Sequence, residues 1–406
     1  GYFDPVPQLG RTDTGGQVVY VLELAKALSL LGYKVDIFTR WFDSSKKQID
    51  PVPGVKNVNV IRIPAGNRQF IPKEFIYDVL PELSKNMTEF INKNTLSYDI
   101  YHGHYVDAGI VAIDVAGSFG KPVFFTAHSL GAWKRDQMGG DPVEMENKFN
   151  FRHRVSEEIR IFNNVKAHTL TSHVQLEKLM ELYNSKSIPT DNIEIIPPGV
   201  DIHHYRLPTE ADKQAKINLP DKYIFCLSRI DTNKGHDLLL NAFDIVRKEI
   251  PHAELVIGGG SPNPNQRESQ VFDKMKSIIA QTGMRGRIHI IGYVPDEMMR
   301  PYYQQCLFFV LPSLFEPFGM TAQEAMACGK TVVASKFGGI KSVITNGENG
   351  FLVDPLNAQE FAEIMINLLK NDELNKKIGL AANNNIVKNY SWEAQAKKHI
   401  ELYNKY

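Results

Sequence analysis

The chain has 406 residues, more than one hydrophobic core usually supports, so two domains of roughly 200 residues each are expected. Its 46 basic and 46 acidic residues cancel, which argues against nucleic-acid and membrane-surface binding and favours small-molecule partners. An apolar run of ~18 residues and a leader pattern are both missing from the sequence, so we expect a cytoplasmic protein that is not integral to a membrane. The oligomeric state is left open by these features.

The first expected element is a helix that follows the opening loop. Gly15 and Gly16 lead into it, and Gly32 is a natural stop at its end. A loop of this kind normally follows a strand, yet no apolar segment precedes Asp13. We therefore expect the chain to start at a fragment boundary, with the first strand of the sheet missing and a loss of stability as the consequence. The predicted buried face of the helix consists of Val18, Val21, Leu22, Ala25 and Leu28.

Short apolar segments then alternate with helical stretches along the whole chain, which predicts α/β domains with parallel sheets covered on both faces. The predicted strands lie within 33–40, 58–64, 98–104, 121–129, 167–172, 193–199, 223–229, 253–260, 287–292, 307–312, 331–335 and 350–354.

Two prolines and a glycine near Pro197 to Asp201 end a strand and mark the linker. The expected organisation is therefore two doubly wound, Rossmann-like domains, residues 1–198 and 199–390, which face a central cleft. A final helix within 391–406 is expected to cross back to the first domain. The cysteines, Cys226, Cys306 and Cys328, lie in apolar surroundings without disulfide or zinc spacing, so we expect buried, reduced thiols.

Two glutamates eight positions apart follow the strand within 307–312. Glu316 precedes the helix expected after Gly319, and Glu324 lies on that helix. The N-terminus of a helix offers unpaired N–H groups and a positive dipole end, which suit a diphosphate. We expect the two carboxylates to meet the hydroxyls of a sugar and a ribose. The amides expected to face the phosphates belong to Phe318, Gly319, Met320 and Thr321.

A second anion-binding element follows the strand within 223–229, at the carboxyl edge where doubly wound sheets bind ligands. Arg229 and Lys234 are placed there to clamp a diphosphate and to neutralise the charge of a leaving nucleotide without a metal. The alternative is a solvated basic turn. The glycines at 258–260 are weaker evidence, because glycines also simply end strands.

The first half carries a loop without obstructing side chains and a set of scattered cations. Gly16 lets a ligand approach the backbone, and His128 comes directly after a strand. Any one of these cations could be an ordinary surface residue. Because they come from separate segments, the group as a whole favours a phosphate pocket. The four cations are Lys73, Lys134, Arg152 and Arg154, and Tyr105 and Ser129 lie in the same group of segments.

At these residues the chain resembles the retaining GT-B glycosyltransferases of the sucrose-phosphate synthase type, with mannosylfructose-phosphate synthases as an especially similar group. The stretches that carry the likeness span nearly the whole chain. They are DTGGQVVYVLELAKAL, GYKVDIFTR, FIPKE, AHSLGAWK, IPPGVD, RIDTNKG and EPFGMTAQEAMACG. The resemblance implies transfer of a hexose from a nucleotide diphosphate sugar (UDP-glucose, GDP-mannose or ADP-glucose) to fructose 6-phosphate. It implies neither a cofactor nor a required metal.

The resemblance also implies roles for single residues. Glu316 would bind the hexose hydroxyls of the donor, Glu324 its ribose, and Arg229 with Lys234 its diphosphate. Gly16 would lie under the donor phosphates and His128 close to the anomeric carbon. The implied acceptor and 6-phosphate pocket consists of Gln17, Lys73, Tyr105, Ser129, Lys134, Arg152 and Arg154.

Three alternatives stay open. The basic cluster argues against free fructose, the acceptor of sucrose synthases. A lipid or glycan acceptor would favour an exposed amphipathic basic helix, and none is clear. A nucleotide-sugar-binding protein without turnover is disfavoured by the intact Glu316, Glu324, Arg229 and Lys234, and favoured by the missing first strand.

Overall fold

The computed structural model describes residues 3–7, 15–183 and 188–406, and the chain forms two compact units. Unit 1 consists of residues 1–199 and Trp392–Tyr406, and unit 2 consists of Val200–Ser391. Asp13 and Thr14 of the glycine-rich loop lie outside the described residues.

Unit 2 is built on a six-stranded, all-parallel sheet with the strand order β10-β9-β8-β11-β12-β13. Numbered from its first strand this is the order 3-2-1-4-5-6 of a doubly wound fold. The direction of winding therefore reverses between β8 and β11. The strands are β8 (Ile224–Leu227), β9 (Leu255–Gly258), β10 (Ile288–Gly292), β11 (Phe308–Leu311), β12 (Val332–Ser335) and β13 (Phe351–Val353).

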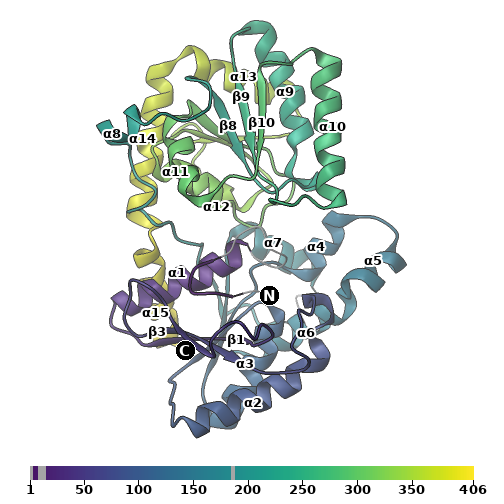
Figure 1. Cartoon of the computed structure of the whole chain (residues 1–406), viewed down its shortest axis with the longest axis vertical. Coiled ribbons are helices and arrows are strands. Elements are labelled where there is room, and N and C mark those ends of the chain that lie inside the picture. The colour runs from purple at the N-terminus through teal and green to yellow at the C-terminus, as the bar shows by residue number, and fades with distance from the viewer. Residues whose placement is uncertain (1–2, 8–14, 184–187) are drawn as a thin grey trace. The chain divides into compact units, whose positions relative to one another are not determined.

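Helices cover both faces of this sheet, because alternate residues of a strand point to opposite sides. In β8, Ile224 and Cys226 face one core, while Phe225 and Leu227 face the other. Figure 1 shows α9 and α10 along one side of the sheet and α11, α12 and α14 along the other. The helices are α8 (Glu210–Gln214), α9 (His236–Glu249), α10 (Gln266–Thr282), α11 (Asp296–Gln305), α12 (Met320–Ala327), α13 (Ala358–Lys370) and α14 (Asp372–Asn389), with the short 3-10 turns η4 (Thr232–Lys234) and η5 (Gly339–Ser342).

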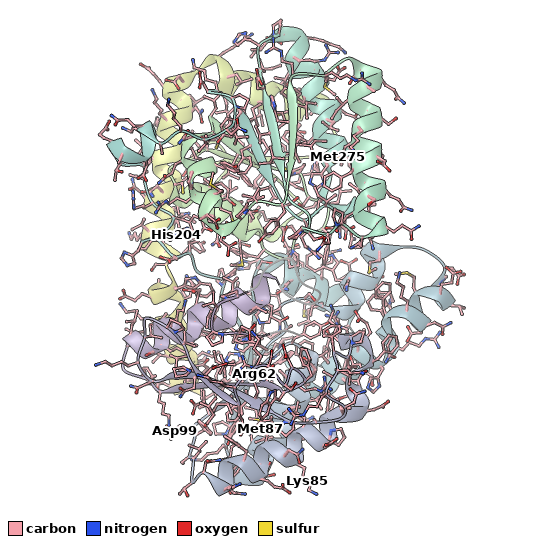
Figure 2. The ribbon with its side chains drawn as sticks, viewed as in Figure 1. Arg62, Lys85, Met87, Asp99, His204 and Met275 are labelled. Carbon is pink, nitrogen blue, oxygen red and sulfur yellow. The ribbon has the colours of Figure 1, made fainter. Side chains whose placement is uncertain are left out.

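The interior of unit 2 is apolar and closely packed. Met275 of α10 is among its buried side chains, and Figure 2 shows it within the unit. The prediction of buried, reduced thiols is confirmed, since Cys226, Cys306 and Cys328 are all free and buried. Burial raises the pKa of Cys226 and of Cys306 to about 12, so these thiols are unreactive.

The strands of unit 1 form a parallel four-stranded sheet, β4-β5-β6-β7, and a three-stranded sheet, β1-β3-β2. The expectation of purely parallel sheets is wrong at one strand, because β2 runs antiparallel to β3. The strands are β1 (Val35–Arg40), β2 (Ile49–Pro51), β3 (Val58–Ile63), β4 (Tyr101–His104), β5 (Val123–Thr126), β6 (Ala167–Leu170) and β7 (Ile193–Ile195).

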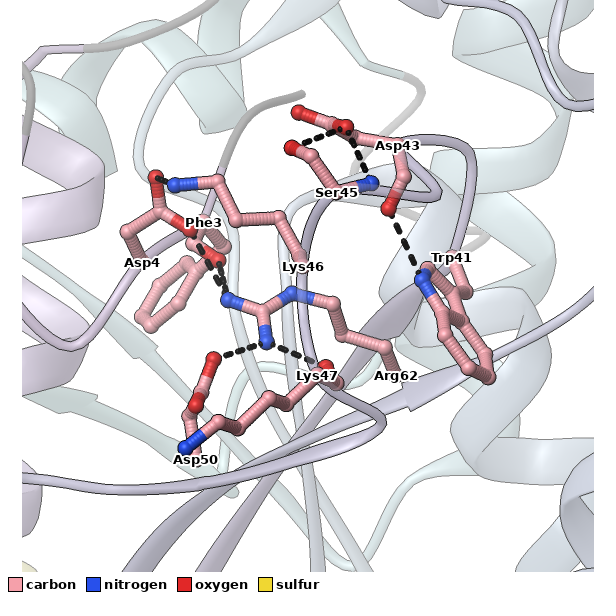
Figure 3. A network of polar contacts seen from close by, with 9 residues as sticks. All are labelled: Phe3, Asp4, Trp41, Asp43, Ser45, Lys46, Lys47, Asp50 and Arg62. Carbon is pink, nitrogen blue, oxygen red and sulfur yellow. Dashed lines mark hydrogen bonds and ion pairs between the residues drawn. The ribbon is translucent and has the colours of Figure 1, made fainter.

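A buried arginine accounts for the position of β2 (Figure 3). Arg62 of β3 is 3% exposed, and its Nη1 donates to Asp50 Oδ2 at 2.5 Å and to the carbonyl of Lys47 at 2.7 Å. Its Nη2 donates to Asp4 Oδ1 at 2.8 Å and to the carbonyl of Phe3 at 3.2 Å. One guanidinium therefore ties both β2 and the segment before the first helix to the edge of the sheet.

The helices of unit 1 pack one apolar face inward. In α2, Met87 is buried while Lys85 is exposed, and Figure 2 shows Lys85 at the outer edge of the unit. The helices are α1 (Gly16–Leu30), α2 (Leu80–Lys93), α3 (Val106–Phe119), α4 (Gly131–Met138), α5 (Pro142–Phe149), α6 (Phe151–Asn164), α7 (His173–Leu182) and α15 (Trp392–Lys405), with the 3-10 turns η1 (Lys73–Phe75) and η2 (Tyr77–Val79).

The helix α1 is buried on more than its predicted face. Tyr20, Leu24 and Ala27 are buried in addition, while Val21 is only partly so. The cause is α15, which packs against α1 within unit 1 although it follows unit 2 in the sequence (Figure 1). The hydroxyl of Tyr20 lies 3.2 Å from His399 Nε2, and its ring packs edge-on against Trp392 at 5.2 Å.

Candidate functional site

In unit 2 the predicted donor residues gather at the carboxyl ends of β8 and β11. These two strands flank the reversal of winding, which is the place where open α/β sheets bind ligands. Arg229 follows β8 and is exposed, and Lys234 ends the 3-10 turn η4 behind it. Glu316 lies in the loop after β11, as predicted.

Lys234 and Glu316 form a close ion pair. Lys234 is 3% exposed, and its Nζ lies 2.7 Å from Glu316 Oε2 and donates to the carbonyl of Phe315 at 3.1 Å. A lysine this deeply buried keeps its charge only with such partners. The pair therefore fixes the position of the Glu316 side chain through Oε2.

The helix α12 starts at Met320, and Gly319 before it has a φ of +100°, which favours glycine. The carbonyl of Gly319 accepts the amides of Ala322 and Gln323. Within the described residues no acceptor is found for the amides of Met320 and Thr321. Such N–H groups, together with the dipole at the N-terminus of a helix, are able to bind an anion, so anion binding at α12 stays a prediction.

Glu324 lies in the second turn of α12 and accepts a hydrogen bond from the Tyr303 hydroxyl at 2.9 Å. Burial raises the pKa of Glu324 to about 8, against the opposing effect of this hydrogen bond. A carboxyl group buried without a cation needs further donors to become ionised. The hydroxyls of a ribose are donors of that kind.

In unit 1 the two predicted residues Tyr105 and His128 lie just after the neighbouring strands β4 and β5, Tyr105 as the first residue after β4 and His128 as the second after β5. Both have positive φ, 78° and 56°, which is uncommon for residues other than glycine. Strained backbone of this kind clusters at binding and catalytic sites. The carboxyl edge of this sheet therefore carries two constrained side chains side by side.

His128 is hydrogen-bonded at both ends. Its Nε2 lies 3.0 Å from His104 Nδ1, and its carbonyl accepts from Gln175 Nε2 at 3.0 Å. The ring of Tyr20 packs edge-on against it at 4.8 Å. Burial lowers the pKa of His128 to about 3, so the imidazole is neutral at pH 7. A neutral ring can position or hydrogen-bond a sugar but cannot supply positive charge to it.

Several of the predicted acceptor residues line one small pocket in unit 1. Lys73 comes from η1, Tyr105 from the end of β4, Lys134 from α4 and Arg154 from α6, which are four separate segments. The guanidinium of Arg154 lies over the Tyr105 ring at 4.7 Å. The complete lining is Lys73, Glu74, Tyr77, Tyr105, Lys134, Phe149, Phe151 and Arg154.

Arg154 also has a structural role that the sequence did not reveal. It is 4% exposed, and its Nε donates to Glu158 Oε1 at 2.8 Å. Its Nη2 donates to the carbonyl of Ser129 at 2.7 Å and to Ser129 Oγ at 3.0 Å. Glu158 in turn accepts from the amide of Gly131 and from the Tyr183 hydroxyl. Glu158 thus occupies the N-terminus of α4 and holds Arg154, which lines the pocket.

Three of the predicted acceptor residues, Gln17, Ser129 and Arg152, are not among the lining residues, although Ser129 is bonded to Arg154. Arg152 is exposed and is not among the lining residues, because two positions on a helix diverge by about 200° and Arg154 takes the inner face of α6. Gln17 donates its side-chain amide to the carbonyl of His104 at 3.1 Å. Gly16 forms the exposed first residue of α1, and a Cβ added to the neighbouring Gly15 would meet nothing within 4 Å.

The sequence reasoning missed Glu158 and Gln175. Both follow patterns that it could have used. Glu158 stands four positions after Arg154, the spacing at which oppositely charged side chains meet on a helix. Ser172 and Gln175 have the spacing of a helix-capping box, and the Ser172 hydroxyl accepts from the amide of Gln175.

Both units match known families. Residues 14–204 match the family described as Glycosyltransferase Family 4, and residues 209–385 match the one described as Glycosyl transferases group 1. No helix in the described part of the chain is both long and apolar enough to span a bilayer.

Curated relatives cover almost the whole chain. The chain is 35% identical to a mannosylfructose-phosphate synthase of Agrobacterium fabrum, over 99% of this chain and 89% of the relative. It is 30% identical to a probable sucrose-phosphate synthase of Thermosipho melanesiensis, over 97% of this chain and 91% of the relative. A D-inositol 3-phosphate glycosyltransferase of Corynebacterium glutamicum is 28% identical over 98% and 94%. The solved sucrose-phosphate synthase of Thermosynechococcus elongatus superposes with a TM-score of 0.83 at 28% identity, over 99% of this chain and 96% of that one.

Proposed function

We propose a reaction for this chain from the premise that it belongs to the GT-B glycosyltransferase family of the sucrose-phosphate and mannosylfructose-phosphate synthases. The proposed reaction is transfer of a hexose, with retention, from a nucleotide diphosphate sugar to fructose 6-phosphate. The donor would be UDP-glucose or GDP-mannose, and the product sucrose 6-phosphate or a mannosylfructose phosphate.

The observation that carries the proposal is the convergence of Lys73, Lys134 and Arg154 on one pocket at the carboxyl edge of the unit 1 sheet. Three cations from separate segments suit the dianionic phosphate of a sugar phosphate, because each can add a charge-assisted hydrogen bond to it. Glu74 and Tyr105 in the same lining are able to bind its hydroxyls. The names of the curated relatives support a phosphorylated acceptor as well.

In unit 2 the donor would be held by its charged and hydroxyl-rich groups. Glu316, fixed by Lys234, would accept from the hexose, and Glu324 from the ribose. The diphosphate would lie at the N-terminus of α12, near the exposed Arg229. These positive groups would neutralise the charge that develops on the leaving nucleotide, so the proposed reaction requires no metal.

The proposed chemistry needs no nucleophile from the protein. The acceptor hydroxyl would attack the anomeric carbon from the face that the nucleotide leaves, and the bond from that carbon to the β-phosphate oxygen would break. The departing β-phosphate would take the proton of the hydroxyl. The chain contributes orientation and charge stabilisation, with the His128 turn at the reacting carbon.

A substrate panel tests this reaction directly. UDP-glucose, GDP-mannose and ADP-glucose are each offered with fructose 6-phosphate, fructose and D-inositol 3-phosphate, and nucleotide release and product mass are measured. We expect transfer to fructose 6-phosphate, undiminished by EDTA. Equal use of free fructose would favour a sucrose-synthase activity. Preference for the inositol phosphate would contradict fructose 6-phosphate as the acceptor but would still agree with a phosphate-binding pocket. Loss of activity in EDTA with recovery in magnesium would contradict the metal-free route.

Single substitutions test the pocket. Lys73→Ala and Lys134→Ala should each raise the KM for fructose 6-phosphate at least tenfold, as expected for one charge-assisted contact worth about 1.5–3 kcal/mol. Arg135→Ala is the matched control, since Arg135 is an exposed cation on the same helix as Lys134 and does not line the pocket. An unchanged KM in both lysine variants would show that the phosphate binds elsewhere.

A further inference from the structure

The loop between β5 and α4 carries His128 in a tight three-residue turn. The amide of Ser129 donates to the carbonyl of Ala127 at 2.6 Å, and His128 between them has a φ of +56°. A residue keeps such a conformation only where its surroundings hold it there. The groups bonded to His128 therefore decide the geometry of the turn.

Gln175 holds the backbone of the turn from α7. Its side chain is fully buried, and its Oε1 accepts from the amide of Thr171 at 2.8 Å and from Thr171 Oγ1 at 3.1 Å. A backbone amide can only donate, so the side-chain oxygen must face Thr171 and the NH₂ group must face the other way. That group donates to the carbonyl of His128 at 3.0 Å.

His104 holds the side chain of the turn from β4. The hydrogen bond between His104 Nδ1 and His128 Nε2 spans 3.0 Å, and the Tyr20 ring closes the space beside the imidazole. His128 is therefore fixed at its carbonyl by the helix α7 and at its ring by the strand β4.

We propose that Gln175 and His104 are positioning residues, which together hold the His128 turn in the geometry that meets the substrate. The inference rests on the proposed function, which places this turn at the reacting carbon. Neither residue lines the acceptor pocket, so both act through His128. A displacement of about 1 Å at a reacting group can lower a rate 100-fold, which gives such residues a measurable effect.

The first test removes the bond to the carbonyl. Gln175→Leu should lower kcat at least tenfold and leave the KM of the nucleotide sugar unchanged, because Gln175 contacts none of the residues assigned to donor binding. Gln175→Glu gives a sharper readout. A protonated glutamic acid can accept from Thr171 with one oxygen and donate its hydroxyl to the His128 carbonyl, whereas a carboxylate repels that carbonyl.

The kcat of Gln175→Glu should therefore fall as the pH rises from 6 to 8.5, since burial raises the pKa of a carboxyl group into or near this range. The kcat of Gln175→Leu should be low at every pH in this range. The other titratable groups around His128 are His102 and His104 from β4, Tyr20 from α1, His399 from α15 and the Arg154–Glu158 pair from α6. They are present in every protein compared, so the ratio of variant to wild-type kcat isolates residue 175.

The second test replaces His104. His104→Asn places an amide group near the position of Nδ1 and should keep most of the wild-type kcat. His104→Phe retains the ring packing without the hydrogen bond and should lose at least tenfold. A wild-type kcat in His104→Phe together with a loss in His104→Asn would assign His104 to packing alone and overturn its positioning role.

A third measurement does not depend on turnover. Backbone hydrogen exchange in residues 127–132 should be at least tenfold faster in Gln175→Leu than in the wild type. Ser84→Ala is the control, since it removes a buried hydroxyl bond to Asp114 in the same unit, away from the turn. Unchanged exchange, or unchanged kcat, overturns the positioning role. A wild type that transfers no hexose overturns the proposed function instead, and hydrogen exchange then decides the positioning role.

Discussion

Glu324 shows how a single carboxyl group links ligand binding to pH. Its pKa lies at about 8 in the folded chain, against an ordinary value of 4.5. Between these two values the folded state holds a proton that the unfolded state has released. The contribution of this group to stability is therefore lost as the pH rises from about 4.5 to 8.

Glu324→Gln should remove this pH dependence, because the amide never ionises. We expect the melting temperature of the variant to equal that of the wild type near pH 5 and to exceed it by at least about 2 °C at pH 8.5, as 1 kcal/mol corresponds to about 2–4 °C for a domain of this size. Calorimetric scans of both proteins across the range measure the difference. The same variant should bind UDP at least tenfold more weakly if Glu324 accepts from the ribose. A constant difference in melting temperature at all pH values would contradict the raised pKa.

Nothing in the surroundings of Gly15 gives a steric reason why this residue must be glycine. Its backbone is extended, and a Cβ would meet no atom within 4 Å. Gly15→Ala should therefore change the melting temperature by no more than a few degrees, the scale of a helix N-cap substitution. We expect kcat/KM for the nucleotide sugar to fall at least tenfold, because the methyl group would obstruct a ligand lying against the start of α1. Wild-type kinetics in this variant would remove the donor from that loop.

At the scale of elements, β2 depends on a tertiary contact more than on its own residues. Its three residues include Pro51, and strands tolerate proline only at an edge. What holds β2 is the Arg62 guanidinium, together with the Arg62 amide, which donates to the carbonyl of Gln48 at 2.7 Å. An arginine 3% exposed between two aspartates keeps both strands and the preceding segment in register.

Arg62→Ala should destabilise unit 1 by about 3–5 kcal/mol, because it leaves Asp4 and Asp50 without their buried partner. Denaturant unfolding followed by tryptophan fluorescence measures the loss. Lys34→Ala is the matched control in the same sheet. Lys34 is exposed and its Nζ lies 3.9 Å from the buried Asp36, which keeps its hydrogen bonds from Asn59 and Tyr98, so the loss of this long contact to an exposed lysine should cost at most about 1 kcal/mol. Equal effects of the two substitutions would show that the Arg62 network contributes no more than a surface contact.

The elements also show what could be read from the sequence. All the predicted strands are present, because each is a run of apolar residues bounded by turn residues. The antiparallel β2 has no such run. The buried face predicted for α1 was narrower than the observed one, because α15, from a distant part of the chain, packs against α1 as well. No local pattern carries that information.

In the candidate site, too, residues placed by a local pattern were predicted correctly, and residues placed by contacts between segments were not. Glu316 and Glu324 were placed by a spacing within one loop and helix, and the structure has them there. Arg152 was grouped with Arg154 because both are cations, but the helical period separates them. Gln175 was missed because its partners, Thr171 and His128, belong to different strand ends. A contact between distant segments could not be predicted from the sequence unless the types of the residues involved suggested it.

At the scale of the whole molecule, neutral histidines are concentrated in unit 1. Burial lowers the pKa of His128 and His168 to about 3 and that of His399 to about 4, and it lowers those of His102 and His104 as well. Among the described residues unit 2 has two comparable groups, His236, with a pKa of about 4, and His204. A histidine with a lowered pKa costs the folded state stability as the pH falls below about 6.5, since only the unfolded chain binds the proton.

Unit 1 should therefore be the more acid-labile part of the chain. At pH 5 each of His128, His168 and His399 lowers the free energy of unfolding by up to about 2 kcal/mol. The three tryptophans, Trp41, Trp133 and Trp392, all belong to unit 1, so their fluorescence follows this unit alone, whereas far-ultraviolet circular dichroism follows both. We expect the fluorescence midpoint in urea to precede the circular-dichroism midpoint at pH 5 by more than at pH 7.5. An identical separation at both pH values would contradict this expectation.

The return of the chain to unit 1 after Ser391 bears on its synthesis. Gly199 packs so closely on Trp392 that a Cβ would come within 2.6 Å of the indole, and Val200 donates its amide to Tyr390 at 2.8 Å. The chain thus leaves and re-enters unit 1 at adjacent points, and unit 2 is in effect an insertion between them. During translation unit 2 can fold as soon as its own residues have emerged, but the helix α1 must wait for α15. At 5–20 residues per second the synthesis of unit 2 alone takes about 10–40 s, and the apolar surface of Tyr20 and Leu24 stays open for at least that time. Unit 1 is therefore the part of the nascent chain that depends most on protection by chaperones.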